Sequence, residues 1–359
     1  MSCSDCTIPE IGSADFLDEL ARRPAGEDTL PMSGSIELTL RCNLRCRHCY
    51  IHAPGAADGE MDTARARKVL DALADAGVLS LLVTGGEIFL RRDFREIYLH
   101  ARRRGFLMTL FTNATRVDDG LADFLAAQPP RRIEISIYGH TAETYERITG
   151  GPGSFAAFRR GLDRLVARDL PVYLKSMVLR SNVHEFAAMK AWAESLGRPF
   201  RYDAIVNARL DGGTEPFAER LPPEEAARWQ VEADAEPRSP AEWRGKTEGW
   251  GPDPRLFRCG AGRVTFHVDP RGMLHPCLMW RRDPYDLLDG SVAGWRRHMA
   301  ELLRRRAPAD SECASCLDRT MCLNCAATSA HEASAPGLPA AYYCAVCRAR
   351  ATRRPSAGK

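Results

Sequence analysis

The stretch RCNLRCRHCY, residues 41–50, places three cysteines, Cys42, Cys46 and Cys49, within eight residues. It follows residues 36–40, where apolar and polar side chains alternate as in a strand. Three thiolates on one loop can hold three irons of a [4Fe–4S] cluster and leave the fourth iron open. An open metal position lets a substrate or cofactor coordinate directly. The alternative is a zinc loop in which His48 is the fourth ligand.

The composition supports metal chemistry in a reducing compartment. The chain has 359 residues, thirteen of them cysteines, and a formal charge of +3, which argues against nucleic acid or a membrane surface as partner. Residues 1–10 lack the apolar core of a signal peptide, and no stretch approaches the roughly 18 apolar residues of a membrane span. We therefore expect a cytoplasmic protein whose clustered cysteines bind metal or act in catalysis.

Strands and helices alternate after the opening strand. Helix starts are indicated by Asp62 and Asp93, and this alternation predicts right-handed crossovers and a parallel sheet. Six strands favour an open, partial (β/α)6 TIM-type barrel, with a doubly wound sheet as the alternative. The strands are expected at 36–40, 79–84, 106–111, 133–138, 172–179 and 200–206. The predicted organisation is a lead-in (1–33), the barrel (34–220), a helix and connector (221–258), a small cysteine-rich iron–sulfur domain held by metal rather than by a large core (259–350), and a tail (351–359).

The cysteine loop resembles the signature of the radical S-adenosylmethionine (SAM) superfamily, Cys-x3-Cys-x2-Cys after the first barrel strand. The resemblance extends to Gly85-Gly86-Glu87, which ends the second predicted strand. Glycines allow close approach of a ligand to the backbone, and the resemblance implies that the Glu87 carboxylate receives the SAM ammonium. The family usually has Pro after this Glu, where the present chain has Ile88. The implied chemistry is reductive cleavage of SAM to a 5′-deoxyadenosyl radical that abstracts hydrogen from a substrate.

The same resemblance implies further SAM-binding residues at the barrel mouth. Tyr50 would lie near the adenine, Ser136 would contact the ribose, and Lys175 would pair with the SAM carboxylate. Asn113 is expected to support the SAM-binding residues without itself contacting SAM. A rim aromatic, a locally satisfied serine and a structural ion pair are the alternatives for the first three.

A second set of cysteines follows residue 258. It resembles the SPASM extension of radical SAM enzymes that modify peptides and proteins, which holds two auxiliary [4Fe–4S] clusters. By position, one cluster would take Cys259, Cys277 and Cys325, and the other Cys313, Cys316, Cys322 and Cys344. Cys347 is left open as a ligand of either cluster or a free thiol, and a zinc ribbon over 313–325 is the alternative. Cys3 and Cys6 fall outside the pattern and are expected to be terminal thiols.

The predicted function is oxidation or cross-linking of a ribosomally made peptide. A small-molecule dehydrogenase or decarboxylase is one alternative, and a non-catalytic metal-stabilised binding protein is another. Leu278 stands where sulfatase-maturing relatives carry an acidic base, so that activity is not predicted. Asp203, Arg209 and Asp211 end the sixth strand and are candidates for a substrate base or clamp, with solvated loop charges as the alternative. The expected partners are a flavodoxin- or ferredoxin-like electron donor and a separate peptide-recognition protein.

Overall fold

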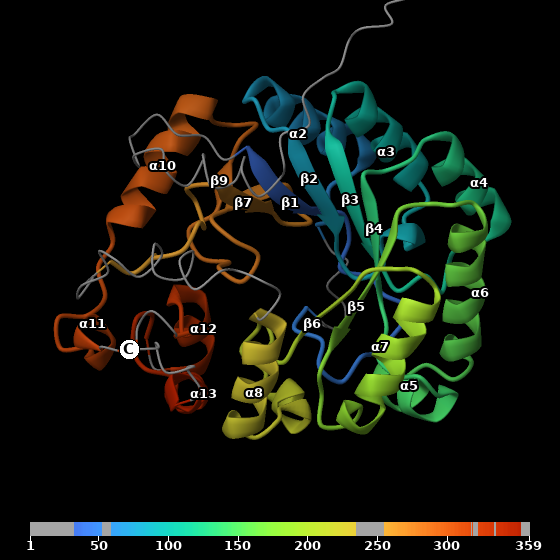
Figure 1. Cartoon of the computed structure of the whole chain (residues 1–359). Coiled ribbons are helices and arrows are strands. Elements are labelled where there is room, and N and C mark those ends of the chain that lie inside the picture. Colours follow the sequence, from blue (N-terminus) through green and yellow to red (C-terminus); the bar gives the residue numbers. More distant parts are fainter. Residues whose placement is uncertain are drawn as a thin grey trace, which may run out of the picture.

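The computed structural model describes residues 32–51, 59–234, 255–316, 318, 322–333 and 335–352. Six parallel strands lie in the order β6-β5-β4-β3-β2-β1, so each strand pairs with its predecessor in the chain (Figure 1). A doubly wound sheet would reverse its order partway, and this sheet does not. The partial (β/α)6 barrel is confirmed and the doubly wound alternative is wrong. The strands are β1 (Ser33–Glu37), β2 (Ser80–Thr84), β3 (Leu107–Thr112), β4 (Arg132–Ser136), β5 (Val172–Met177) and β6 (Phe200–Asp203).

Helices cover the outer face of the sheet and bury their apolar sides against it (Figure 1). Asp62 caps the first of them, accepting a hydrogen bond from the amide of Arg65 at 2.7 Å. Asp93 also stands at a helix start, but its carboxylate binds Arg91 and Thr63 instead of a helix amide, which corrects the predicted cap. The barrel helices are α2 (Thr63–Asp75), α3 (Phe94–Arg103), α4 (Asp119–Ala127), α5 (Ala142–Thr149), α6 (Ser154–Ala167) and α7 (Phe186–Ser195).

The parallel register brings the carboxyl ends of the strands to one edge of the sheet. Thr84, Thr112, Ser136 and Asp203 are the last residues of their strands, and the cysteine loop begins just after β1. Residues far apart in the sequence therefore meet at a single mouth, as in other barrels built from parallel strands.

The cysteine-rich region extends the barrel sheet instead of forming a separate unit. β7 (Thr265–Val268) pairs in parallel with β1, and the antiparallel strands β8 (Met273–His275) and β9 (Tyr285–Asp286) complete nine strands. Phe266 and Trp295 belong to the same apolar core as the barrel residues. The cysteine-rich region therefore has apolar core residues that it shares with the barrel.

Helices of this region lie beside the barrel (Figure 1). α8 (Pro223–Asp234) leads out of the barrel and packs against α13 (Ala341–Thr352). The remaining helices are α10 (Val292–Arg304), α11 (Glu312–Ser315) and α12 (Ala326–Glu332). This packing brings the end of the chain back to the carboxyl edge of β6.

Some predictions lie outside the described residues. They concern most of the lead-in with Cys3 and Cys6, most of the connector, and residues 353–359. Among the helices that are described, none combines the length and the apolar character needed to cross a bilayer.

Candidate active site

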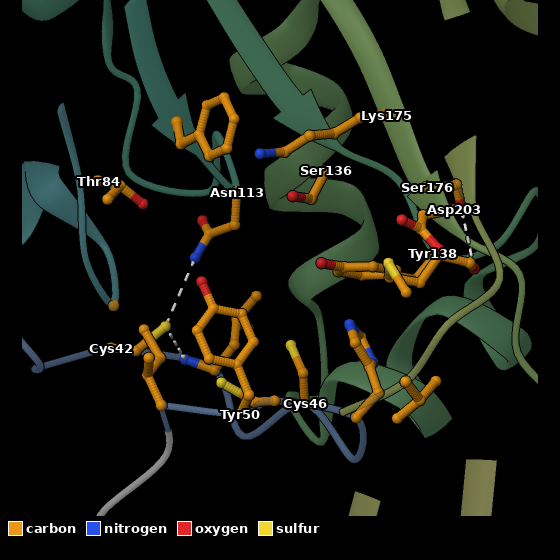
Figure 2. A pocket seen from close by; sticks show the side chains of 18 of the residues that line it. Cys42, Cys46, Tyr50, Thr84, Asn113, Ser136, Tyr138, Lys175, Ser176 and Asp203 are labelled. Atoms are coloured by element: carbon orange, nitrogen blue, oxygen red, sulfur yellow. Dashed lines mark hydrogen bonds between the residues drawn. The ribbon is translucent and has the colours of Figure 1, made fainter. Parts of the chain in front are cut away.

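A cavity of about 350 Å³ opens at the carboxyl edge of the parallel strands. Its volume is in the range of small-molecule sites. The side chains that line it come from the cysteine loop, the turn after β2, and the ends of β3 to β6 (Figure 2). The ends of β2 to β6 thus line one chamber together with the cysteine loop and the segment after β6.

Cys42, Cys46 and Cys49 all line this cavity. The loop is held in shape by backbone hydrogen bonds from Arg45 and Arg47 to the carbonyls of Thr149 and Ile148, 2.8 and 2.9 Å long. These carbonyls belong to the end of α5, so the cysteine loop is hydrogen-bonded to a helix of the barrel.

The thiols of the loop are poor acids in the absence of metal. Burial raises the pKa of Cys42 to about 11, helped by the nearby Glu87 and Cys49 and opposed by the amide of Leu44. Burial also raises the pKa of Cys46, with Cys49 and Cys42 adding to the effect. A bound metal would favour the thiolate forms and offset the electrostatic repulsion among these neighbouring negative groups. In the described part of the chain, no three His, Cys, Asp or Glu side chains lie close enough to share a single ion, as a zinc site requires.

Gly85 and Gly86 form a cradle against the start of the cysteine loop. Gly85 has φ +145°, and a Cβ there would lie 2.3 Å from the carbonyl oxygen of Thr39. A Cβ on Gly86 would lie 2.3 Å from the carbonyl oxygen of Arg41. Only glycine allows this turn to pack directly on the loop. Both glycines line the cavity, so their backbone is open to a ligand there.

Glu87 turns away from the cavity. Its carboxylate accepts hydrogen bonds from the Thr112 hydroxyl at 2.8 Å and from the amides of Asn113 and Phe89 at 2.8 and 3.2 Å. The side chain is fully buried, and burial raises its pKa against these hydrogen bonds. Glu87 therefore ties the turn after β2 to the end of β3. Its oxygens are hydrogen-bonded within the protein, and its contact with the SAM ammonium stays a prediction.

Three other predicted SAM-binding residues project into the cavity opposite the cysteine loop (Figure 2). Asn113, Ser136 and Lys175 all line it. The Lys175 ammonium lies over the Phe111 ring, 2.7 Å from the ring centre. Burial lowers its pKa, against the attraction of Glu134. A carboxylate bound in the cavity would restore the charge that burial disfavours.

Tyr50 lines the cavity from the cysteine-loop side and shares that side with His48, whose contacts the sequence did not indicate. His48 packs edge-on against Tyr138, with ring centres 4.4 Å apart. Its Nδ1 atom is buried and accepts or donates no hydrogen bond within the described residues. Asn113 reaches the loop from the other side, with Nδ2 3.9 Å from the Cys42 sulfur (Figure 2).

The three candidate substrate residues separate in space. Asp203 lines the cavity, and its carboxylate accepts hydrogen bonds from the Ile205 amide and from Gln230, both 2.7 Å long. Arg209 and Asp211 form an ion pair with each other in the following loop and do not line the cavity. This corrects the grouping of all three at the mouth, since local pairing satisfies two of them.

The auxiliary cysteines divide into two groups. Burial raises the pKa of Cys277, and the nearby Cys325 and Cys259 add to this effect. Burial, with Cys322, Cys313 and Cys316 nearby, raises the pKa of Cys344. The assignment of these cysteines to two clusters stays a prediction.

Cys347 belongs with the second group. A hydrogen bond with Cys322 and burial raise its pKa, and its sulfur donates to the Asp318 carbonyl at 3.2 Å. Asn324 is a residue that sequence reasoning missed here. It is buried, and its amide and side chain donate to the sulfurs of Cys322 and Cys313 at 3.4 and 3.5 Å.

Comparisons with known proteins agree with this geometry. The profile of the radical SAM superfamily matches residues 36–193. The chain is 30% identical to the PqqA peptide cyclase of Xanthomonas euvesicatoria over 69% of its length and 68% of that protein. It is 29% identical to the mycofactocin maturase MftC of Mycobacterium ulcerans over 74% of its length and 71% of that protein. It is also 32% identical to the AdoMet-dependent heme synthase of Methanosarcina barkeri, but this match spans only 45% of the chain and 46% of the relative.

Two solved structures share the fold across most of the chain. SuiB of Streptococcus suis bound to S-adenosylmethionine aligns with a TM-score of 0.66 and 13% identity, covering 88% of this chain and 77% of SuiB. The enzyme anSMEcpe with bound AdoMet aligns with a TM-score of 0.60 and 15% identity, covering 89% of this chain and 95% of that one. Because a cysteine loop, a glycine cradle and paired cysteine groups coincide with these matches, the chain belongs to the radical SAM superfamily as a SPASM-type member, with SAM and [4Fe–4S] clusters as its cofactors.

Proposed function

We propose that this radical SAM enzyme oxidises or cross-links a ribosomally made peptide. The observation that carries the proposal is the shape of the cavity. The cysteine loop and the glycine cradle line its SAM end, and Asp203, which lies apart from Cys42 in Figure 2, lines the part that we call its far end. SAM coordinated at the first end leaves the second end for a substrate.

The relatives favour a peptide over a small molecule. The matches to the peptide cyclase and to the mycofactocin maturase extend over 69% and 74% of this chain, whereas the match to the heme synthase stops at 162 residues. The subtilosin biosynthesis protein AlbA of Bacillus subtilis matches 77% of the chain at 26% identity. The long matches therefore include residues outside the barrel, and their names refer to peptide products.

The residues of the chain have distinct tasks in this proposal. When bound, the clusters and SAM supply the electron and the carbon radical that removes hydrogen from the substrate. Gly85 and Gly86 expose backbone to SAM, while Lys175 offers a cation to its carboxylate and Ser136 a hydroxyl to its ribose. Asp203 accepts the proton that the oxidised substrate releases, because it is the one of the three candidate residues that lines the cavity. The auxiliary clusters, when bound, would take up the second electron that this oxidation releases.

The test is anaerobic turnover of the reconstituted chain with SAM, dithionite and a synthetic short peptide encoded beside its gene. Mass spectrometry should show the peptide lighter by two hydrogen atoms, together with 5′-deoxyadenosine. Release of 5′-deoxyadenosine with every candidate peptide unchanged would reject the peptide substrate. A chain that loads only zinc and releases no 5′-deoxyadenosine would support the non-catalytic alternative.

Two matched variants distinguish the role of a carboxylate inside the cavity from that of a carboxylate outside it. Asp203→Asn keeps the Oδ1 acceptor used by Ile205 and Gln230 but removes the base. We expect product to fall by about 10²-fold or more while 5′-deoxyadenosine is still released. Asp211→Asn makes the same chemical change outside the cavity and should leave the ratio of product to 5′-deoxyadenosine near that of the wild type.

The physiological setting is part of the proposal. A chain with thirteen cysteines, most of them in clusters, suits a reducing cytoplasm, where disulfides are rare. The electron donor would be a flavodoxin- or ferredoxin-like protein, and a separate recognition protein would present the peptide. Pull-down with the purified chain under anaerobic conditions tests both partners.

A further inference from the structure

The segment after β6, residues 206–208, forms part of the far wall of the cavity without being part of the sheet. β6 ends at Asp203, while Val206 and Asn207 line the cavity. The backbone of this segment must therefore be held by groups other than neighbouring strands. Three such groups are present, and two of them come from the cysteine-rich region.

Tyr343 and Glu332 reach the wall from the end of the chain. The Tyr343 hydroxyl, on α13, donates to Asn207 Oδ1 at 2.6 Å. The Glu332 carboxylate, at the end of α12, accepts a hydrogen bond from the Ala208 amide at 3.2 Å. The same Glu332 oxygen lies 3.3 Å from the Tyr343 hydroxyl, so both residues act on the wall together.

Arg220 completes the arrangement from the barrel side. Its Nε donates to the Val206 carbonyl at 2.9 Å, and its guanidinium pairs with Glu332 at 2.6 Å. The Arg220 and Glu332 side chains are only 9% and 5% exposed, so each charge depends on the other. Each of the three wall residues is thus bonded to one member of a single buried network.

We infer that Tyr343 and Glu332 are positioning residues, which hold the substrate end of the cavity in place from the cysteine-rich region. Glu332 lies on the helix that Cys325 begins, and Tyr343 precedes Cys344. The placement of this wall is therefore coupled to the placement of the auxiliary cysteines. The inference depends on the proposed function only in calling this end of the cavity the substrate end.

Hydrogen exchange of the full-length, reconstituted chain with SAM present tests the wall directly. Tyr343→Phe removes the hydroxyl and keeps the buried ring. We expect the Ala208 amide to exchange about tenfold faster, as for the loss of one buried hydrogen bond, while the amides of β5 are unchanged. Tyr342→Phe is the matched control, because the Tyr342 hydroxyl donates instead to the Leu221 carbonyl at 3.2 Å. It should leave exchange at Ala208 within about twofold of wild type.

A second variant guards against misfolding. Asn207→Ala removes the acceptor from the cavity side without altering α13, and it should also accelerate exchange at Ala208. Wild-type exchange in a Tyr343→Phe protein with full iron content would overturn the inference. Loss of iron in Tyr343→Phe combined with wild-type exchange at Ala208 in Asn207→Ala would also overturn it, because the Tyr343 hydroxyl would then support the cysteine-rich region and not the wall. The exchange measurement uses no peptide, so failure of the proposed peptide chemistry would leave this result to stand by itself.

Discussion

Gly86→Ala is the substitution that most directly tests the cradle. The new Cβ would lie 2.3 Å from the Arg41 carbonyl oxygen, 2.6 Å from its carbon and 2.7 Å from the Leu40 carbonyl oxygen. Ordinary contact begins at 3.4 Å, so the backbone must move by about 1 Å. The atoms in the way are main chain and cannot rotate aside. Because Cys42 follows Arg41, the movement displaces a predicted cluster ligand.

The magnitude follows from the cost of overpacking. Strain of this kind typically costs about 1–3 kcal/mol, and three backbone contacts argue for the upper end. If the cysteine loop is displaced to relieve this strain, the binding free energy of SAM weakens by about 3 kcal/mol. This corresponds to about a hundredfold weaker SAM binding. Equilibrium dialysis of SAM against the anaerobically reconstituted protein measures this, and iron content measures loading of the cluster.

Gly120→Ala is the matched control for this test. Gly120 lies in α4, and a Cβ there would meet its nearest atoms, of Arg95 and Asp118, at 3.6 and 3.7 Å. We expect unchanged SAM binding and a gain in stability of about 0.5–1 kcal/mol from the helix. The reasoning is refuted if Gly86→Ala keeps full iron and binds SAM within about threefold of the wild type.

Three further predictions concern the core, a buried histidine and the second cysteine group. Trp295→Ala should destabilise the chain by about 3–5 kcal/mol in urea unfolding, because Trp295 is fully buried against Phe266, 5.2 Å between ring centres; a loss below about 1 kcal/mol would contradict the shared core. Burial lowers the pKa of His267 from 6.5 to about 4, against the attraction of Glu37. The unfolded chain therefore takes up a proton below pH 6.5 that the folded chain refuses, and stability should fall by up to about 1.4 kcal/mol per pH unit as pH decreases towards 4. Urea midpoints at pH 7.5 and 5.5 should differ less for His267→Gln, and equal differences would count against this explanation. Cys344→Ala should lower iron from about twelve to about eight per chain with SAM binding unchanged, and full iron in this variant would remove Cys344 from the ligand set.

Much of the fold and the SAM end of the site could be predicted from the sequence. The cysteine loop and Gly85-Gly86 are local patterns, in which spacing alone brings the chemistry together. The order of alternating strands and helices also implied the barrel, because parallel neighbours need crossovers of one hand. The family resemblance pointed to Asn113, Ser136 and Lys175, and all three line the cavity.

Side-chain direction could not be predicted in the same way. Glu87 belongs to a recognised motif, yet it points to Thr112 because a buried carboxylate must find donors, and those donors come from another strand. Arg209 and Asp211 follow β6 closely in the sequence, which predicted a place at the cavity mouth. In the structure they form an ion pair with each other in their own loop. In each case a competing partner determined where the charge lies.

The sequence by itself determined the cofactor chemistry of this protein. The site of a radical SAM cluster is marked by three cysteines and a glycine turn, and both are short patterns at fixed spacing in the chain. Only the tertiary structure decided how the cysteine-rich region meets the barrel. β7 joins β1, Cys347 lies beside Cys322, and Tyr343 bonds to Asn207, although 136 positions separate the last pair. Such contacts depend on how whole elements pack, and no local pattern of spacing or periodicity records that packing.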